Sequence, residues 1–213
     1  RDSWKLDLNV FLAKAIEAWR ELFPAFAVDT AQLTSDLSAL LRQRITSQLE
    51  DDGYAADLVQ AVAGDTVSTT RLLHDPLDVR VRIQLLRGLR DQGRLTAVQA
   101  VVQRASRLAE KGDLPLDVLS STEVVDPSRF ESASEKGLFD ATKRLNPLAE
   151  SGAYQELCDV LVESTPALEA FFDGDESVMV MADDSALRMN RLNLLGVLRN
   201  QAAVFAQFEL IQS

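Results

Sequence analysis

The sequence predicts an all-α fold, a helical bundle of short antiparallel helices. Apolar residues recur at a spacing of about 3.6 in one segment after another, and the segments are separated by helix caps and breakers. No alternation of apolar and polar residues, as a half-buried strand would show, extends beyond a few positions. With 213 residues, 46% of them hydrophobic, the chain can bury one large core or two modest ones.

Three helices are predicted in the first third of the chain. The first covers 6–22 and ends at a proline. A second begins with Asp29 or Thr30 as its N-cap and continues to the DDG break at 51–53. A short third helix covers 54–64. The short breaks between them favour antiparallel neighbours.

Two helices follow before the middle of the chain. Asp75 is a suitable N-cap for the helix predicted over 74–93, because Pro76 then takes the first helical position, where no N–H is needed. Gly93 ends this helix. The segment 96–112 carries a regular apolar stripe and closes with lysine and glycine, a C-terminal helix signal.

Residues 113–125 are acidic and loop-like, and they form the one candidate linker. The sequence therefore predicts a single helical domain over 1–213. The alternative is two packed lobes, 1–112 and 126–213, joined by this acidic loop.

The second half of the chain restarts helix at the Asp-Pro of 126–130. A break is expected at Thr165, because it precedes Pro166. The VMVM run at 178–181 is the one candidate for extended structure, with a buried turn as the alternative. A last helix is expected to begin with Asp183 as its N-cap. The other predicted helices are 131–152, 153–164 and 165–174.

Charge is unevenly distributed along the chain. The net charge is −11, yet residues 71–112 hold nine basic and four acidic side chains, while 113–177 hold four basic and fifteen acidic ones. A basic segment in an acidic protein is either a solvated helix face or a surface for RNA phosphates, and both interpretations stay open.

Several classes of function are disfavoured. The single histidine and single cysteine offer too few ligands for a zinc or iron site, and we expect no metal. The scattered glycines form no phosphate-binding loop, and no serine lies in a nucleophile-elbow pattern, so we expect no catalytic residue. No run is long enough to span a bilayer. We expect neither a membrane nor DNA as a partner, and the lack of an initiating Met suggests an excised piece of a longer chain.

Individual reactive residues have structural interpretations. His74 lies at a helix start and is expected at the surface or as a capping group. Cys158 is flanked by apolar residues and is expected in the core, as are Met179 and Met181. The Asp pairs at 51–52 and 183–184 are expected at helix ends.

The stretch 171–195, FFDGDESVMVMADDSALRMNRLNLL, raises a specific question. Its helix has an apolar stripe that leads backward to Arg188, and Arg191 lies beside it on the same flank. These arginines either cap carbonyls and pair with neighbours such as Asp184, or line a pocket near the helix N-terminus that accepts bases or phosphate.

This stretch closely resembles the C-terminal signature of the bacterial-type glycyl-tRNA synthetase beta subunit, in which the pattern FFD-x-VMVMA-D-D-x-x-LR-x-NRL-x-LL recurs. Agreement extends upstream, through the spacing of Tyr154, Leu157, Leu161 and Pro166. QRASRLAEKG is similar to the family's K-R-V-x-N segment, although Glu110 replaces its final Asn. The resemblance covers nearly the whole chain and is looser before Leu138.

The resemblance implies a helical anticodon-binding domain of the DALR-like type found in class I synthetases such as arginyl-tRNA synthetase. It implies a beta subunit that recognises glycine tRNA within a heterotetramer of two alpha and two beta subunits. The alpha subunit would carry the class II site for glycine, ATP and Mg, so this fragment would hold no cofactor and would not catalyse alone. The implied location is the bacterial cytoplasm, or an organelle if the chain comes from a plastid.

The same resemblance suggests the residues that read the anticodon. Glycine codons are GGN, so two anticodon letters are C, in an unpaired loop whose base edges can be read. Carboxylates can accept from the cytosine N4 amino group, and Arg or Asn can donate to its O2 and N3 atoms. The candidates for these contacts are Asp184, Arg188, Asn190 and Arg191.

A second group of candidates is suited to the RNA backbone. Arg104, Arg107 and Lys111 are spaced three and four residues apart on one helix flank, as phosphate contacts would require. The alternative function is a helical assembly module that docks protein within the same synthetase and does not touch tRNA.

Overall fold

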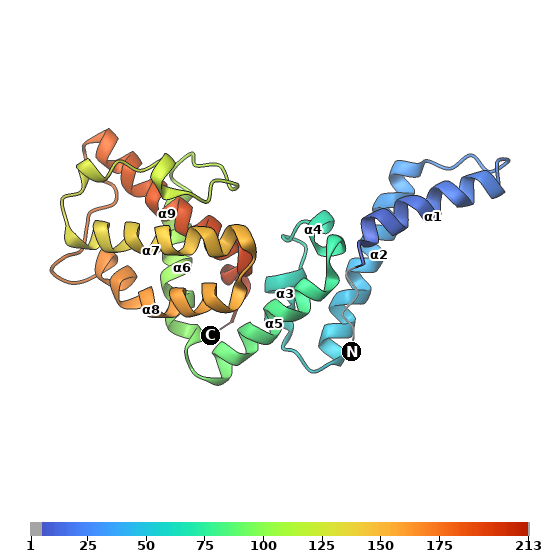
Figure 1. Cartoon of the computed structure of the whole chain (residues 1–213), viewed down its shortest axis with the longest axis horizontal. Coiled ribbons are helices and arrows are strands. Elements are labelled where there is room, and N and C mark those ends of the chain that lie inside the picture. The colour runs from blue at the N-terminus through green and yellow to red at the C-terminus, as the bar shows by residue number, and fades with distance from the viewer. Residues whose placement is uncertain (1–5, 213) are drawn as a thin grey trace. The chain divides into compact units, whose positions relative to one another are not determined.

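A computed structural model describes residues 6–212 and confirms the all-α fold, with no strand in that range (Figure 1). Most helices begin and end where the caps and breakers predict. The helices are α1 (Leu8–Leu22), α2 (Thr30–Asp51), α3 (Ala56–Ala63), α4 (Thr69–His74), α5 (Pro76–Asp91), α6 (Leu95–Ala109), α7 (Ala133–Ser151), α8 (Tyr154–Phe172) and α9 (Ser185–Phe205), with short 3-10 turns η1 (Ser121–Glu123), η2 (Pro127–Arg129) and η3 (Phe208–Leu210).

The described residues divide into two compact units. The first unit comprises 6–87 together with 210–212, and the second comprises 88–209. The division falls inside α5. Residues 113–125, which the sequence suggested as a linker, lie within the second unit.

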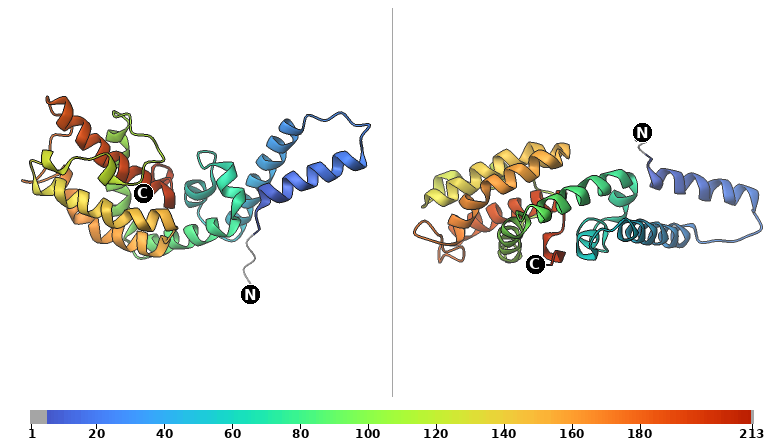
Figure 2. Two further views of the ribbon diagram at one scale, coloured as in Figure 1. Left: turned by 45° about the horizontal axis from the view of Figure 1, so that its top comes forward. Right: turned by 90° about the horizontal axis from the view of Figure 1, so that it is seen from below.

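The first unit is built on the long helix α2. Asp7 and Asp29 cap α1 and α2 by accepting hydrogen bonds from backbone N–H groups of the first turns, at 2.9–3.2 Å. The two helices form a hairpin, and α3 and α4 pack beside α2 (Figure 2). α3 buries most of its eight residues, whereas α1 buries only Leu12 and Ile16.

One buried arginine links three helices of this unit. Arg42 of α2 donates hydrogen bonds to the carbonyl oxygens of Ala63 (3.1 Å), Gly64 and Val67 (2.6 Å) and to the Thr69 hydroxyl (2.5 Å). These acceptors lie at the end of α3 and the start of α4. The guanidinium therefore satisfies carbonyl groups that the end of α3 leaves without intrahelical partners.

The second unit is a bundle of α6, α7, α8 and α9 (Figure 1). α9 contacts both α6 and α7, and α8 contacts the same two helices. Phe171 of α8 and Phe205 of α9 are fully buried. More than half of α9 is buried, so this helix is the centre of the unit.

Side chains of α9 hold residues 113–126, which we call the acidic segment. Gly196 leaves room for it, because a Cβ there would lie 2.8 Å from Cδ2 of Leu114. We call the α9 side chains that donate to the carbonyls of this segment the amide ladder. Its bonds run from Asn190 to Asp126 (3.1 Å), Asn193 to Val124 (2.9 Å), Arg199 to Leu114 (3.1 Å), Asn200 to Pro115 and Val118 (both 2.8 Å), and Gln201 to Leu119 (2.6 Å). Side-chain amides and the Arg199 guanidinium thus satisfy backbone carbonyls of this segment.

Two predicted element boundaries are wrong. The helix predicted to break before Pro166 continues as the single helix α8, and the Thr165 hydroxyl donates to the Leu161 carbonyl at 3.0 Å in the preceding turn. Packing of α8 outweighs the local penalty of the proline. The N-cap of α9 is Asp184, one residue after Asp183.

Side-chain environments around the VMVM run also differ from prediction. Val180 and Met181 form a turn after irregular backbone at 178–179, and Val180 is buried. Met179 and Met181 are 74% and 43% exposed, so the expected core position is wrong for both. The short helix α4 was missed, because six residues are too few for a periodic pattern.

Cys158 is expected to be unreactive in the folded protein. Its side chain is buried, and burial raises the pKa of the thiol to about 12, so almost no thiolate exists at pH 8. An aromatic disulfide reagent at pH 8 should label no thiol in native protein and one thiol per chain in urea. Stoichiometric labelling without denaturant would contradict the buried position.

Candidate nucleic-acid interface

The N-terminus of α9 carries two of the predicted site residues at the surface. The Asp184 carboxylate accepts hydrogen bonds from the backbone N–H groups of Ala186 (2.7 Å) and Leu187 (2.9 Å). These bonds hold the pKa of Asp184 below its usual range, with help from the charges of Arg129 and Arg188. Half-buried Arg188 donates to the Ala182 carbonyl at 2.8 Å.

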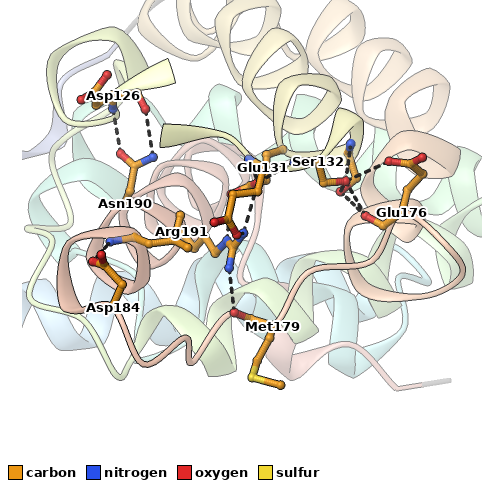
Figure 3. A network of polar contacts seen from close by, with 11 residues as sticks. Asp126, Glu131, Ser132, Glu176, Met179, Asp184, Asn190 and Arg191 are labelled. Carbon is orange, nitrogen blue, oxygen red and sulfur yellow. Dashed lines mark hydrogen bonds and ion pairs between the residues drawn. The ribbon is translucent and has the colours of Figure 1, made fainter. Parts of the chain in front are cut away.

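Asn190 is buried and its amide is engaged with its own chain. It accepts from the Asp126 N–H at 2.7 Å and donates to the Asp126 carbonyl at 3.1 Å (Figure 3). Both polar atoms of the side chain are therefore used to hold the end of the acidic segment.

Arg191 is also buried, at the centre of a network of charges (Figure 3). It pairs with fully buried Glu135 at 2.8 Å and with Glu131 at 3.0 Å, and it donates to the Met179 carbonyl at 3.1 Å. Glu135 in turn accepts from the N–H of Ser132 at 3.0 Å, as part of the capping box that begins α7.

Opposing effects act on the Arg191 guanidinium. Burial lowers its pKa, but hydrogen bonds and charge attraction from Glu135 and Glu131 outweigh that effect and leave the pKa above its usual value. Its donors point to groups of the protein. Of the two interpretations that the sequence left open for the arginines, these contacts favour the structural one for Arg191.

A pocket of about 440 Å³ lies beside the first half of α9. Its polar groups include the exposed side chains of Glu123, Asp126 and Arg129, and Met189 adds an apolar surface that is 41% exposed. Arg129 pairs with Asp126 at 3.3 Å, and both side chains are about half exposed. The remaining lining residues are Val124, Val125, Ala186, Asn190 and Asn193.

This pocket combines hydrogen-bond donors, acceptors and an apolar surface within reach of solvent. Such a set can bind the edge and the face of an unstacked nucleobase. Glu123, Arg129 and Met189 were not among the predicted site residues. The available signal was the Asp-Pro at 126–127, which places a helical turn and Arg129 after the acidic segment, but no sequence pattern shows that this turn faces α9.

The three candidates on α6 and just after it are exposed. Arg104 pairs with Asp173 at 2.5 Å and lies over the Phe172 ring, 4.6 Å from its centroid. The side chains of Arg107 and Lys111 make no hydrogen bond or ion pair within the described part of the chain. None of the three lines the pocket beside α9.

A larger hollow, of about 610 Å³, lies in the first unit between α2 and its neighbours. Hydroxyl and amide side chains dominate its lining, and Arg42 is its one cationic lining residue. Because the Arg42 guanidinium already donates to four oxygens of the protein, this hollow is poorly suited to phosphate.

Residues 6–212 contain neither a candidate membrane span nor a candidate metal-binding group. In that range, no helix has the length and apolar character needed to cross a bilayer. Nor do three or more His, Cys, Asp or Glu side chains gather there in a group that could hold a metal ion.

Comparison with known proteins places the sequence beside one group. No family model matches the chain. It is 40% identical over 215 residues to the glycine-tRNA ligase beta subunit of a Picosynechococcus species and 41% identical over 214 residues to that of Acaryochloris marina, covering 98% and 97% of this chain. The beta subunit of Aliivibrio salmonicida is 30% identical over 213 residues.

The chain spans about 30% of the length of the Picosynechococcus and Acaryochloris relatives and 28% of the Aliivibrio one. The resemblance to glycine-tRNA ligase beta subunits is thereby confirmed. The assignment to a DALR-like anticodon-binding region stays a prediction.

Proposed function

We propose that this chain is a part of a glycine-tRNA ligase beta subunit and that its second unit reads the anticodon of glycine tRNA. Similarity to beta subunits over 97–98% of the chain supports the first statement. The pocket beside α9 carries the second, because it joins a cation, carboxylates and an exposed thioether in one surface hollow.

The chemistry of cytosine matches this pocket. The N4 amino group of the base would donate to the Glu123 or Asp126 carboxylate, and the O2 and N3 atoms would accept from Arg129. Met189 would support the face of the ring. Arg188 and Asp184, at the adjacent N-terminus of α9, would contact a second base or the neighbouring backbone.

Asn190 and Arg191 have a different role in this proposal. They keep the acidic segment, α7 and α9 in the arrangement that forms the pocket, and they do not touch RNA. Arg107 and Lys111 would bind phosphates, and Arg104 would join them if its exposed pair with Asp173 opens. The net charge of −11 would keep nonspecific affinity for RNA low.

In the whole enzyme, the rest of the beta subunit and an alpha subunit would complete the function. The alpha subunit would join glycine to tRNA with ATP and Mg, in an assembly of two alpha and two beta subunits. The alternative, an assembly module without tRNA contact, is favoured by apolar residues exposed on α1.

Arg129→Ala should remove most of the preference for the cognate anticodon. The test titrates the intact beta subunit, with its alpha subunit, with glycine tRNA and with a tRNA whose two anticodon C letters are U. A good base contact contributes about 1–3 kcal/mol of discrimination, so the preference should fall about tenfold.

Arg144→Ala is the matched control, because Arg144 is an exposed arginine of the same unit that pairs with Glu163 at 2.7 Å. Its preference should equal that of the wild type. Full retention of the preference in Arg129→Ala would remove Arg129 from the reading site.

Arg107→Ala should act differently, weakening binding of both tRNAs equally. Loss of one phosphate contact should lower the slope of log K against log salt by about one. The measurement is the same titration at four salt concentrations. An unchanged slope and affinity would place Arg107 outside the interface.

A further inference from the structure

α1 carries a second apolar stripe that its own unit does not cover. Leu12 and Ile16 are buried, and α1 packs against α2 and α4. Phe11, Ala15, Ala18 and Leu22 are spaced four, three and four residues apart, and they therefore line up on a neighbouring face of the helix. All four are exposed, with Phe11 at 63% and Leu22 at 73%.

Beside this stripe, α1 and α2 enclose an apolar groove of about 410 Å³. At the end of the hairpin, Trp19, Phe23 and Phe26 form an aromatic cluster with ring centroids 5.7–6.3 Å apart. Figure 2 shows this end of the hairpin lying away from α3 and α4. The groove is lined by Ala15, Ile16, Trp19, Val28, Leu33 and Leu37. We call the stripe, the groove and the aromatic cluster the hairpin face.

The opposite side of α1 has the composition of a solvated surface. Its exposed residues include Lys14, Glu17, Arg20 and Glu21. A helix with one polar side and two neighbouring apolar stripes is typical of one that packs between two partners. Within the described residues α1 contacts α2 and α4, and neither helix covers the stripe.

We propose that the hairpin face is a docking surface for an apolar helical surface of the rest of the beta subunit. This inference rests on the proposed function, because it needs the chain to be part of that subunit. About 70% of the Picosynechococcus and Acaryochloris relatives lies outside the matched region, so a large covalently linked partner is implied.

Two physical arguments favour this occupant. A linked partner has an effective concentration of about millimolar, so a modest apolar contact suffices to hold it. Charge argues against RNA: the helix turns beside the aromatic cluster carry Glu17 and Glu21 against Arg20, and Asp29 follows the cluster. RNA-stacking aromatic residues lie instead in positively charged grooves.

The test places a photocrosslinking amino acid at Phe11 in the intact beta subunit, in complex with the alpha subunit. Cross-links to peptides of the beta subunit outside this chain are expected. The same group at Glu17, on the solvated side of α1, is the matched control and should yield at least about fivefold less of that product.

Cross-links from Phe11 to the alpha subunit, to tRNA, to a second beta subunit, or to no partner would each overturn the proposal. A second measurement, the rate of protease cleavage, tests whether docking keeps the hairpin closed. Phe11→Glu with Leu22→Glu should raise protease cleavage within 23–28 about tenfold, because the released hairpin opens more often. An unchanged rate would also argue against docking.

The two proposals fail in different ways. Equal binding of the two tRNAs by the wild-type protein, with Phe11 still cross-linked to the rest of the beta subunit, would refute anticodon reading only. Intact preference without those cross-links would refute docking only.

Discussion

Arg191→Ala should lower the free energy of unfolding by about 3–5 kcal/mol, because it leaves the carboxylate of Glu135 buried without its cation. Glu135 is fully buried, and Arg191 is 4% exposed. The variant also removes a donor from the Met179 carbonyl, 3.1 Å away. Urea unfolding followed by circular dichroism measures the loss.

Two further variants make this prediction specific. Arg191→Met combined with Glu135→Gln removes both charges and keeps a side-chain acceptor for the start of α7, so it should recover more than half of the lost stability. Arg144→Ala breaks an exposed ion pair and should cost less than about 1 kcal/mol. A loss below about 1 kcal/mol in Arg191→Ala would show that water reaches the Glu135 carboxylate.

Arg42→Ala should lower the free energy of unfolding by about 2–4 kcal/mol, which is the second largest expected effect. Hydrogen bonds from a charged donor contribute about 1.5–3 kcal/mol each, but the polar hollow beside Arg42 lets water replace some of them. Hydrogen exchange should be faster at the amides of α3 and α4, whose ends Arg42 joins. Urea unfolding gives the magnitude.

Arg44→Ala is the control, because Arg44 is an exposed neighbour on the same helix. It should change stability by no more than about 0.5 kcal/mol. The stability of Arg42→Lys should lie between those of Arg42→Ala and Arg44→Ala, since an ammonium group cannot reach all four oxygens. Equal stability of Arg42→Ala and Arg44→Ala would refute the structural role of Arg42.

Local chemistry made most helices predictable. Asp29 and Pro76 mark helix starts because a cap and a missing N–H act within one turn. The break expected at Pro166 was wrong for the opposite reason: burial of residues such as Phe171 depends on helices far away in the sequence. Sequence periodicity does not report how strongly such contacts favour a continuous helix.

The candidate site was less predictable than the fold. Periodicity correctly placed Arg188 and Arg191 beside the core stripe of α9, but it could not show that Glu135, 56 residues away, is the partner of Arg191. Arg129 was missed because a three-residue 3-10 turn is too short for a periodic signal, and its position depends on the amide ladder. The resemblance to a known family identified the right stretch without separating structural residues from exposed ones.

The amide ladder also limits how the protein can change during evolution. Its donors have a fixed spacing along a rigid helix. The carbonyls of the acidic segment must therefore have the same spacing to accept from them. A deletion between Leu119 and Val124 would shift one half of the segment against its donors while leaving the other half in place. A stretch whose regular structure is a single 3-10 turn therefore has a length requirement as strict as the register of a paired strand.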